Sequence, residues 1–223
     1  MDKKLIGQAL VKFLCGIIIT GLLIFLPAGT LSFRNGWLLM GILFIPMLVA
    51  GLIMAFKSPE LLRKRLSSKE KQKGQQAVVK LSGLMFIAGF VLAGLGYRFG
   101  WYQLPVWTVV VSAAIFLLSY AMYMEVMREN AYLSRTIEVQ EGQKVIDTGL
   151  YGIVRHPMYT ATILLFLSMP LVLGSIYSFL IFLVYPFIIA KRIRGEEALL
   201  ESELEGYAEY KRKVKYRLLP FIW

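Results

Sequence analysis

Four apolar runs, each about as long as a bilayer is thick, limit what this chain can fold into. They cover residues 10–31, 37–56, 81–99 and 104–124. About 20 apolar residues in a helix span the hydrocarbon core of a membrane, so each run predicts one spanning helix. The chain is also 57% hydrophobic and only 17% charged, whereas about a quarter of the residues of soluble domains are charged. These features predict an all-α, polytopic membrane protein.

A fifth apolar run, residues 160–190, is too long for a single span. Three residues that favour turns interrupt it near its middle: Pro170, Gly174 and Ser175. We therefore expect a C-terminal helical hairpin that enters and leaves on the same side of the membrane. Pro46 and Pro186 fall within predicted helices, where a proline is expected to produce a kink.

The positive charges lie almost entirely on one side of the predicted spans. Among 25 lysines and arginines, only Arg34 and Arg98 fall in the two short loops of the opposite side. All the others lie before or early in the first run, in segments 57–80 and 125–159, or after residue 190. Cytoplasmic loops carry such an excess, so both termini and these two segments are predicted to be cytoplasmic. The net charge of +11 thus predicts topology and not nucleic-acid binding.

Polar residues are unevenly distributed along what we predict to be one membrane domain. Residues 1–124 form a scaffold, whereas residues 125–223 carry nearly all the polar chemistry. Cys15 is the only cysteine and His156 the only histidine, which argues against disulfides and against a metal site. The shortness of the chain favours a prokaryotic plasma membrane.

The stretch YGIVRHPMY, residues 151–159, predicts a helix start at the membrane surface. A residue before proline is held extended, so His156 should precede the helix. Pro157 suits the first helical turn. Helix N-termini attract anions; Arg155 and His156 would add donors, and two tyrosines would add aromatic faces. The alternative is that these residues only anchor the chain at the interface.

The hairpin leaves the membrane through KRIRGEEALLESELEGYAEYKRKVKYRLLP. Arg192 and Glu196 are four residues apart and share a helix face. Leu200, Leu204 and Tyr207 continue an apolar stripe, which predicts a cytoplasmic amphipathic helix. A solvated, salt-bridged helix is the alternative. Because both ends of a hairpin lie on one side, these groups should meet RHPMY in a polar pocket. Such a pocket suits a zwitterionic, aromatic and cationic ligand such as S-adenosylmethionine.

Together, the two segments resemble the isoprenylcysteine carboxyl methyltransferases and the related phospholipid N-methyltransferases. The pattern is G-x-Y-x-x-x-R-H-P-x-Y, then R-x-x-x-E-E-x-x-L, G-Y-x-x-Y-x-x-x-V and a terminal proline. It covers roughly residues 140–220, with one extra residue in LEGY. The resemblance implies an integral membrane methyltransferase whose C-terminal half holds S-adenosylmethionine.

The resemblance also implies roles for individual residues. It assigns these positions to the cofactor site: Gln140, Gln143, Lys144, Val145, Ile146, Tyr151, His156, Pro157, Met158, Tyr159 and Glu196. It assigns Arg192 to the carboxylate of the acceptor. No segment of the chain matches a prenyl-binding signature.

Two kinds of methyl acceptor are compatible with these residues. A carboxylate is already ionised at neutral pH and needs no base, so catalysis would come mainly from proximity and orientation. An amine would need a proton acceptor, for which Glu197 or a tyrosine is the candidate. Carboxyl O-methylation of an isoprenylcysteine-like acceptor is the leading prediction, and phospholipid or amine N-methylation is the alternative.

Two interpretations from other classes remain. The hairpin architecture also resembles the C-terminal part of the sterol reductases, which use a nicotinamide cofactor. A non-enzymatic membrane protein, such as a transporter subunit, is a further alternative, although the spans carry few of the ionisable residues that translocation pathways need. The expected partners are a lipophilic small molecule or lipidated cysteine and membrane lipids, without nucleic acid.

Overall fold

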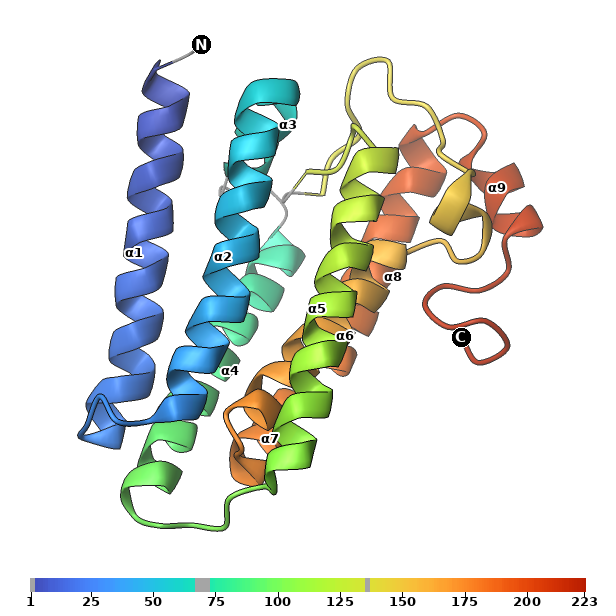
Figure 1. The fold of residues 1–223 in the computed structure, drawn as a ribbon. Coiled ribbons are helices and arrows are strands. Elements are labelled where there is room, and N and C mark those ends of the chain that lie inside the picture. Colours follow the sequence, from blue (N-terminus) through green and yellow to red (C-terminus); the bar gives the residue numbers. More distant parts are fainter. Residues whose placement is uncertain (1–2, 67–72, 135–136) are drawn as a thin grey trace.

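The computed structural model describes residues 3–66, 73–134 and 137–223, and the regular elements of these ranges are helices. Arg135 and part of the basic segment 57–80 lie outside them. Five helical segments are long and apolar enough to cross a membrane: Lys4–Ala28, Arg34–Lys57, Gln75–Arg98, Val106–Glu129 and Ile176–Glu203. The shorter apolar helix Pro157–Val172 lies among them (Figure 1). This confirms the predicted all-α, polytopic fold.

The four predicted N-terminal spans correspond to long helices. They are α1 (Lys3–Ala28), α2 (Arg34–Lys57), α4 (Lys73–Arg98) and α5 (Val106–Glu129), with the short α3 (Pro59–Leu66) after α2. The first span ends at Ala28, before the predicted residue 31. Gly29 adopts a φ of 67° and donates its N–H back to Phe25 and Leu26, which closes the last turn of the helix.

The predicted C-terminal hairpin is present and contains three helices. They are α6 (Pro157–Val172), α7 (Ile176–Phe182) and α8 (Tyr185–Glu203), and the short helix α9 (Tyr207–Lys213) follows. Of the three expected turn residues, Gly174 lies in the turn with a φ of 76°, and Ser175 caps α7. Pro170 instead lies inside the last turns of α6. The turn therefore begins later than predicted.

At Pro186 the structure shows a break and not a kink. Proline has no N–H to donate to the carbonyl four residues earlier, which here belongs to Phe182. Phe182 is the last residue of α7, and α8 begins at Tyr185 with Pro186 in its first turn. The lost hydrogen bond thus falls between two helices. Pro46 lies within α2, as expected.

The turn of the hairpin lies at the end of the bundle opposite α9 and the start of α6 (Figure 1). There the N–H of Leu104 donates to the carbonyl of Gly174 at 2.9 Å, and Gln103 forms an isolated β-bridge with Ser175. A Cβ atom on Gly174 would lie 2.9 Å from Nδ2 of Asn35. The 16 residues of α6 are about 24 Å long at 1.5 Å per residue. The hairpin therefore extends as far as the predicted external loops.

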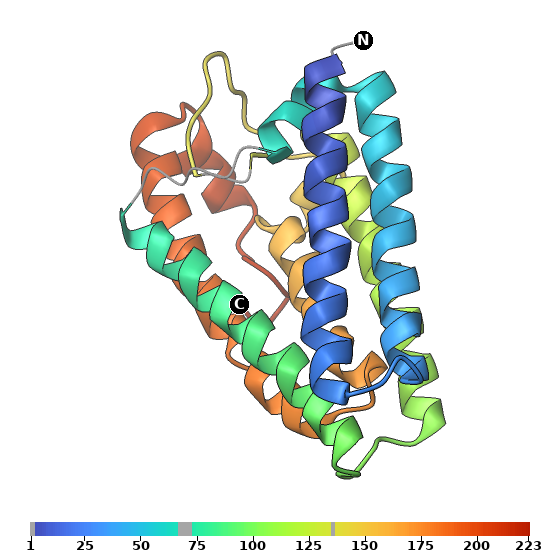
Figure 2. The same ribbon diagram turned by 90° about the vertical axis from the view of Figure 1, so that its left-hand side faces the viewer.

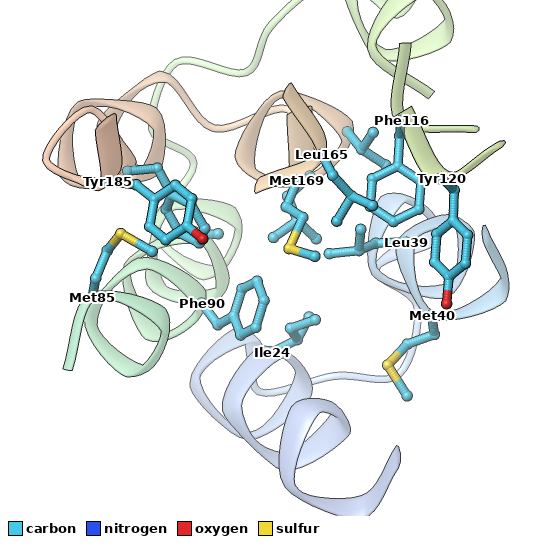
Figure 3. Packing of buried hydrophobic residues seen from close by; sticks show 14 of the residues in the cluster. Ile24, Leu39, Met40, Met85, Phe90, Phe116, Tyr120, Leu165, Met169 and Tyr185 are labelled. Atoms are coloured by element: carbon cyan, nitrogen blue, oxygen red, sulfur yellow. The ribbon is translucent and has the colours of Figure 1, made fainter. Parts of the chain in front are cut away.

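The core is a shared apolar cluster inside the bundle. Its buried side chains come from helices of both halves, and they include Ile24, Leu39, Phe90, Phe116, Leu165 and Met169 (Figure 3). Gly94 allows α4 to approach α1 closely, because a Cβ atom there would lie 2.5 Å from the carbonyl oxygen of Ile24. From this contact α4 diverges from α1 toward the other face, where it lies along α8 (Figure 2).

We predict that the α6–α7 turn and the loop after α1 are accessible from the same side of the membrane. With Cys15 replaced by alanine, Ser32→Cys and Tyr177→Cys should react with an impermeant maleimide added from outside. Ser202→Cys, near the end of α8, should react only after permeabilisation; all three native side chains are exposed. Labelling of Tyr177→Cys together with Ser202→Cys would contradict a hairpin that crosses the bilayer.

Candidate active site

The start of α6 has the predicted local structure. His156 is the N-cap, with a φ of −126° and a ψ of 59°, and Pro157 is the first helical residue. The C-terminal tail pairs with this segment: the N–H groups of Arg155 and His156 donate to the carbonyls of Tyr216 and Arg217, both at 2.9 Å. These two N–H groups are therefore used within the protein and do not add to an anion site.

A buried cluster of charges lies behind the helix start, centred on Glu197. Its Oε1 accepts from Nε of Arg155 at 2.8 Å and lies 3.2 Å from Nε2 of His156, and its Oε2 accepts from Nε of Arg217 at 2.9 Å. Arg155 also donates to the carbonyls of Val214 and Lys215. The side chains of Glu197 and Arg155 are each 4% exposed. The guanidinium of Arg155, expected to bind a ligand, instead joins α6, α8 and the tail.

Beside this cluster lies a cavity, here called the polar cavity. It is lined by most of the residues predicted to hold the cofactor: Gln143, Lys144, Val145, Ile146, Tyr151, His156, Met158, Tyr159 and Glu196. Gln140 and Pro157 do not line it. Glu197, considered as a proton acceptor, does not line it either, because its carboxylate faces the buried cluster.

Gln140 supports the wall of the polar cavity from behind. Its Nε2 donates to the carbonyl of Tyr132 at 2.6 Å, and its backbone N–H donates to Oε1 of Gln143 at 2.9 Å. The hydroxyl of Tyr132 donates in turn to the carbonyl of Gly142 at 3.1 Å. The loop after α5 is thus held together by its own hydrogen bonds, and Gln140 positions Gln143.

Several residues of the polar cavity were not predicted to line it. They are Asn130, Tyr132, Leu133, Ser134, Ile137, Glu138, Leu200, Leu204, Tyr207 and Tyr210. For Leu200, Leu204 and Tyr207 the signal was the apolar stripe, which was interpreted only as helix amphipathicity. The six lining residues between positions 130 and 138 follow α5 in an irregular loop, where the sequence has no periodic pattern that would mark a site.

A buried polar atom in the polar cavity lacks a partner within the residues that the structure describes. It is the hydroxyl of Tyr207, which has no hydrogen bond to any of them, and the residue is 4% exposed. Burial raises the pKa of Tyr151, Tyr207 and Tyr210 well above the ordinary value of tyrosine. These three tyrosines are therefore neutral and do not act as proton acceptors. A ligand that accepts or donates one hydrogen bond at Tyr207 would remove the cost of its unpaired hydroxyl.

A second cavity, here called the apolar cavity, lies within the bundle between α2, α4, α5, α6 and α8. Its volume is about 530 Å3, which is larger than the volume of about 110 Å3 of the polar cavity. Its wall is mainly aliphatic and aromatic, and it includes Arg192. Ser134, Met158 and Tyr159 line both cavities, so the two meet at the first turn of α6.

Tyr159 links the two predicted ligand-binding side chains at this junction. Its hydroxyl donates to Oε2 of Glu196 and accepts from Nε of Arg192 at 2.9 Å. Glu196 lines the polar cavity, whereas Arg192 lines the apolar cavity. The spacing of four residues on α8 therefore places a carboxylate and a guanidinium in adjoining cavities, joined by one phenol.

We predict different consequences for the two adjacent glutamates. Glu197→Gln leaves the buried guanidinium of Arg155 without its counter-charge, which costs about 3–5 kcal/mol in other proteins. The melting temperature in detergent should fall by roughly 10 °C. Glu196→Gln changes a cavity wall and should melt close to the wild type. Equal melting temperatures for both variants would show that the Glu197 cluster does not stabilise the fold.

Comparison with known proteins supports this interpretation of the fold. Residues 107–205 match the family model of phospholipid methyltransferases. Among solved structures, the eukaryotic intramembrane Ras methyltransferase, isoprenylcysteine carboxyl methyltransferase, superposes with a TM-score of 0.50. The match covers 97% of this chain and 94% of that one, at 16% identity. This similarity concerns the fold.

Similar curated proteins include three Δ14-sterol reductases. That of Methylotuvimicrobium alcaliphilum is 23% identical over 137 residues, which are 55% of this chain and 32% of the reductase. That of mouse is 28% identical over 40% of this chain and 22% of the reductase. That of Arabidopsis thaliana is 29% identical over 54% of this chain and 36% of the reductase. The chain thus spans about a third or less of these relatives.

The matched segment contains α6 and α8, the helices that carry His156, Tyr159, Arg192 and Glu196. The whole bundle, including its N-terminal helices, follows the fold of the isoprenylcysteine enzyme. Residues 107–205 are thus similar to the phospholipid methyltransferase family, and the chain as a whole shares its fold with an isoprenylcysteine carboxyl methyltransferase.

Proposed function

We propose that the protein transfers a methyl group from S-adenosylmethionine to a lipophilic acceptor at the cytoplasmic side of a prokaryotic plasma membrane. One observation carries the proposal. A polar cavity with a carboxylate adjoins an apolar cavity with a guanidinium, and Tyr159 lines both. A water-soluble methyl donor and a membrane-soluble acceptor need such adjoining sites, because each arrives from a different phase.

The residues of the polar cavity suit S-adenosylmethionine. Glu196 is available for its positive charges, Lys144 for its carboxylate, and the tyrosine rings for its adenine. The unpaired hydroxyl of Tyr207 offers one further hydrogen bond. When bound, this cofactor supplies an electrophilic methyl group on a sulfonium. Gln143, Val145 and Ile146 complete the wall, while Gln140 and Pro157 act from behind it.

The groups at the junction favour an acceptor that carries no removable proton. A carboxylate reacts as the anion, so the protein need only bind and orient it. An amine requires a base, but Glu197 is surrounded by Arg155, His156 and Arg217. The raised pKa values of Tyr151, Tyr207 and Tyr210 also remove these tyrosines as bases. We therefore favour carboxyl O-methylation of an isoprenylcysteine-like acceptor.

Two alternatives have specific support. The matched family model is that of phospholipid methyltransferases, which supports N-methylation of a lipid amine. The matches to sterol reductases, at 23–29% identity, support a nicotinamide-dependent reductase. The reductase predicts binding of NADPH, whereas both methyltransferase alternatives predict binding of S-adenosylmethionine.

We predict that the purified protein binds S-adenosylmethionine but not NADPH in titration calorimetry. Glu196→Gln should weaken this binding by roughly ten- to hundredfold, because it removes a charge-assisted contact. The neighbouring Glu201→Gln removes the same charge from an exposed position on α8 and should bind as the wild type does. Binding of NADPH instead would overturn the proposal in favour of the reductase.

Arg192→Ala should keep its affinity for S-adenosylmethionine and lose methyl transfer to membrane lipids or to N-acetyl-S-farnesylcysteine. The reason is that Arg192 lines only the apolar cavity, where we place the acceptor. Because Arg192 also donates to Tyr159, Tyr159→Phe is the control for disturbance of Glu196 through the phenol. If Arg192→Ala loses as much cofactor affinity as Glu196→Gln, Arg192 belongs to the cofactor site.

A further inference from the structure

Residues 217–223, here called the tail loop, fold back on themselves after α9. The carbonyl of Trp223 accepts from the N–H groups of Arg217 and Leu218, both at 2.9 Å, and the N–H of Trp223 donates to the carbonyl of Leu219 at 3.2 Å. Cζ of Arg217 also lies 5.1 Å from the centre of the Trp223 ring. These contacts within the loop give its backbone a defined conformation.

The tail loop begins at the start of α6 and continues along the first turn of that helix. The N–H of His156 donates to the carbonyl of Arg217, and the hydroxyl of Thr160, one turn further along α6, donates to the carbonyl of Leu218 at 2.8 Å. Leu218 is buried in the shared core, and Trp223 packs against that core. The tail accordingly runs from α9 toward the middle of the bundle (Figures 1 and 2).

The length of α6 places the tail loop within the depth of the bilayer. The 16 residues of α6 are about 24 Å long, whereas the hydrocarbon core is about 30 Å thick. Because the other end of α6 reaches the opposite loops, its first turn lies below the surface of the membrane. Leu164, one turn after Thr160 on the same face of α6, is 42% exposed and thus faces lipid. The tail loop continues this lipid-facing surface.

The tip of the tail loop is apolar and exposed. Leu219 is 46% exposed, Phe221 is 89% exposed and Ile222 is 78% exposed. Phe221 adopts a φ of 66°, which is uncommon for a bulky residue. Exposed apolar groups that lie together mark sites of contact with a membrane or with another protein. Lys215, also exposed, precedes the loop, and such a side chain reaches the headgroups while an apolar neighbour enters the acyl chains.

The tail loop is joined to the buried charge cluster through Arg217. Nε of Arg217 donates to Oε2 of Glu197 at 2.9 Å. The side chain of Arg217 is 28% exposed, whereas those of Arg155 and His156, which also contact Glu197, are 4% and 5% exposed. Of these three partners, Arg217 is therefore the one whose position depends on what surrounds the tail loop.

We propose that the tail loop is an interfacial anchor. It inserts Leu219, Phe221 and Ile222 into the acyl chains of the leaflet at the α9 end of the bundle, and this insertion holds Arg217 against Glu197. We favour lipid over a protein partner because the loop lies beside a membrane helix and continues its lipid-facing surface. The inference goes beyond the proposed function, since it concerns contact with the bilayer and not a ligand of either cavity.

The first test measures the depth of the loop in vesicles of dioleoyl phosphatidylcholine and dioleoyl phosphatidylglycerol. With Cys15 replaced by alanine, Phe221→Cys carries a nitroxide, and its collision rates with oxygen and with a water-soluble nickel chelate are compared. Oxygen concentrates among acyl chains, so Phe221→Cys should favour oxygen as the lipid-facing control Leu164→Cys does. Ser202→Cys, at an exposed position near the end of α8, should favour the nickel chelate.

The second test measures melting temperatures in lipid nanodiscs. Phe221→Asp places a charge among acyl chains, which should withdraw the loop and lower the melting temperature by roughly 2–4 °C or more. Ser202→Asp adds the same charge at an exposed position and should melt as the wild type does. In an Arg217→Gln background, Phe221→Asp should cause no further decrease, because the contact with Glu197 is already lost.

Two results would overturn the inference. Preference for the nickel chelate at Phe221→Cys would leave the loop in water or assign it to a protein partner. A decrease in melting temperature that is absent for Phe221→Asp, or equally large with and without Arg217, would show that insertion does not act through this arginine. Neither measurement uses S-adenosylmethionine, so the anchor and the proposed function can fail separately.

Discussion

The site depends on one buried carboxylate, that of Glu197. Two charges taken out of water are stable only when they are paired and hydrogen-bonded, and Glu197 meets Arg155, His156 and Arg217 together. These partners come from the start of α6 and from the C-terminal tail, whereas Glu197 belongs to α8. The cluster therefore fixes the relative position of α6, α8 and the C-terminal tail beside the polar cavity. The adjacent residue Glu196 lines the polar cavity. Glu197 therefore has a structural role, whereas the role proposed for Glu196 is ligand binding.

The helical hairpin brings the two cavities together. Its turn extends to the opposite loops, where Leu104 donates to Gly174, and its two ends return to the same surface. Consequently Tyr159 at the start of α6 contacts Arg192 and Glu196 near the end of α8. A phenol between a carboxylate and a guanidinium couples the wall of the polar cavity to that of the apolar cavity.

The N-terminal helices are part of the site as well as of the bundle. α2 and α4 supply apolar wall to the second cavity, and α3 supplies Arg65. Gly94 lets α4 lie against α1 at one end, while α4 diverges toward the other face and lies along α8 there (Figure 2). Because helices of both halves line the apolar cavity, the predicted division into scaffold and catalytic half describes where polar residues are concentrated and not which residues line that cavity.

The sequence by itself determined the features that depend on local or one-dimensional patterns. Apolar length predicted the spans, the His156–Pro157 pair predicted the helix start, and the spacing of Arg192 and Glu196 placed both on one face of α8. Only the tertiary structure decided which partners these residues meet. The Glu197 cluster joins residues 155, 197 and 217, and the contact of Arg65 with Met158 joins positions 93 residues apart. Periodicity and local preference carry no information on such contacts, because the packing of helices selects them. For the same reason Gln140 lies behind the wall of the polar cavity and Arg155 donates to Glu197, whereas the Tyr207 hydroxyl is left for a ligand.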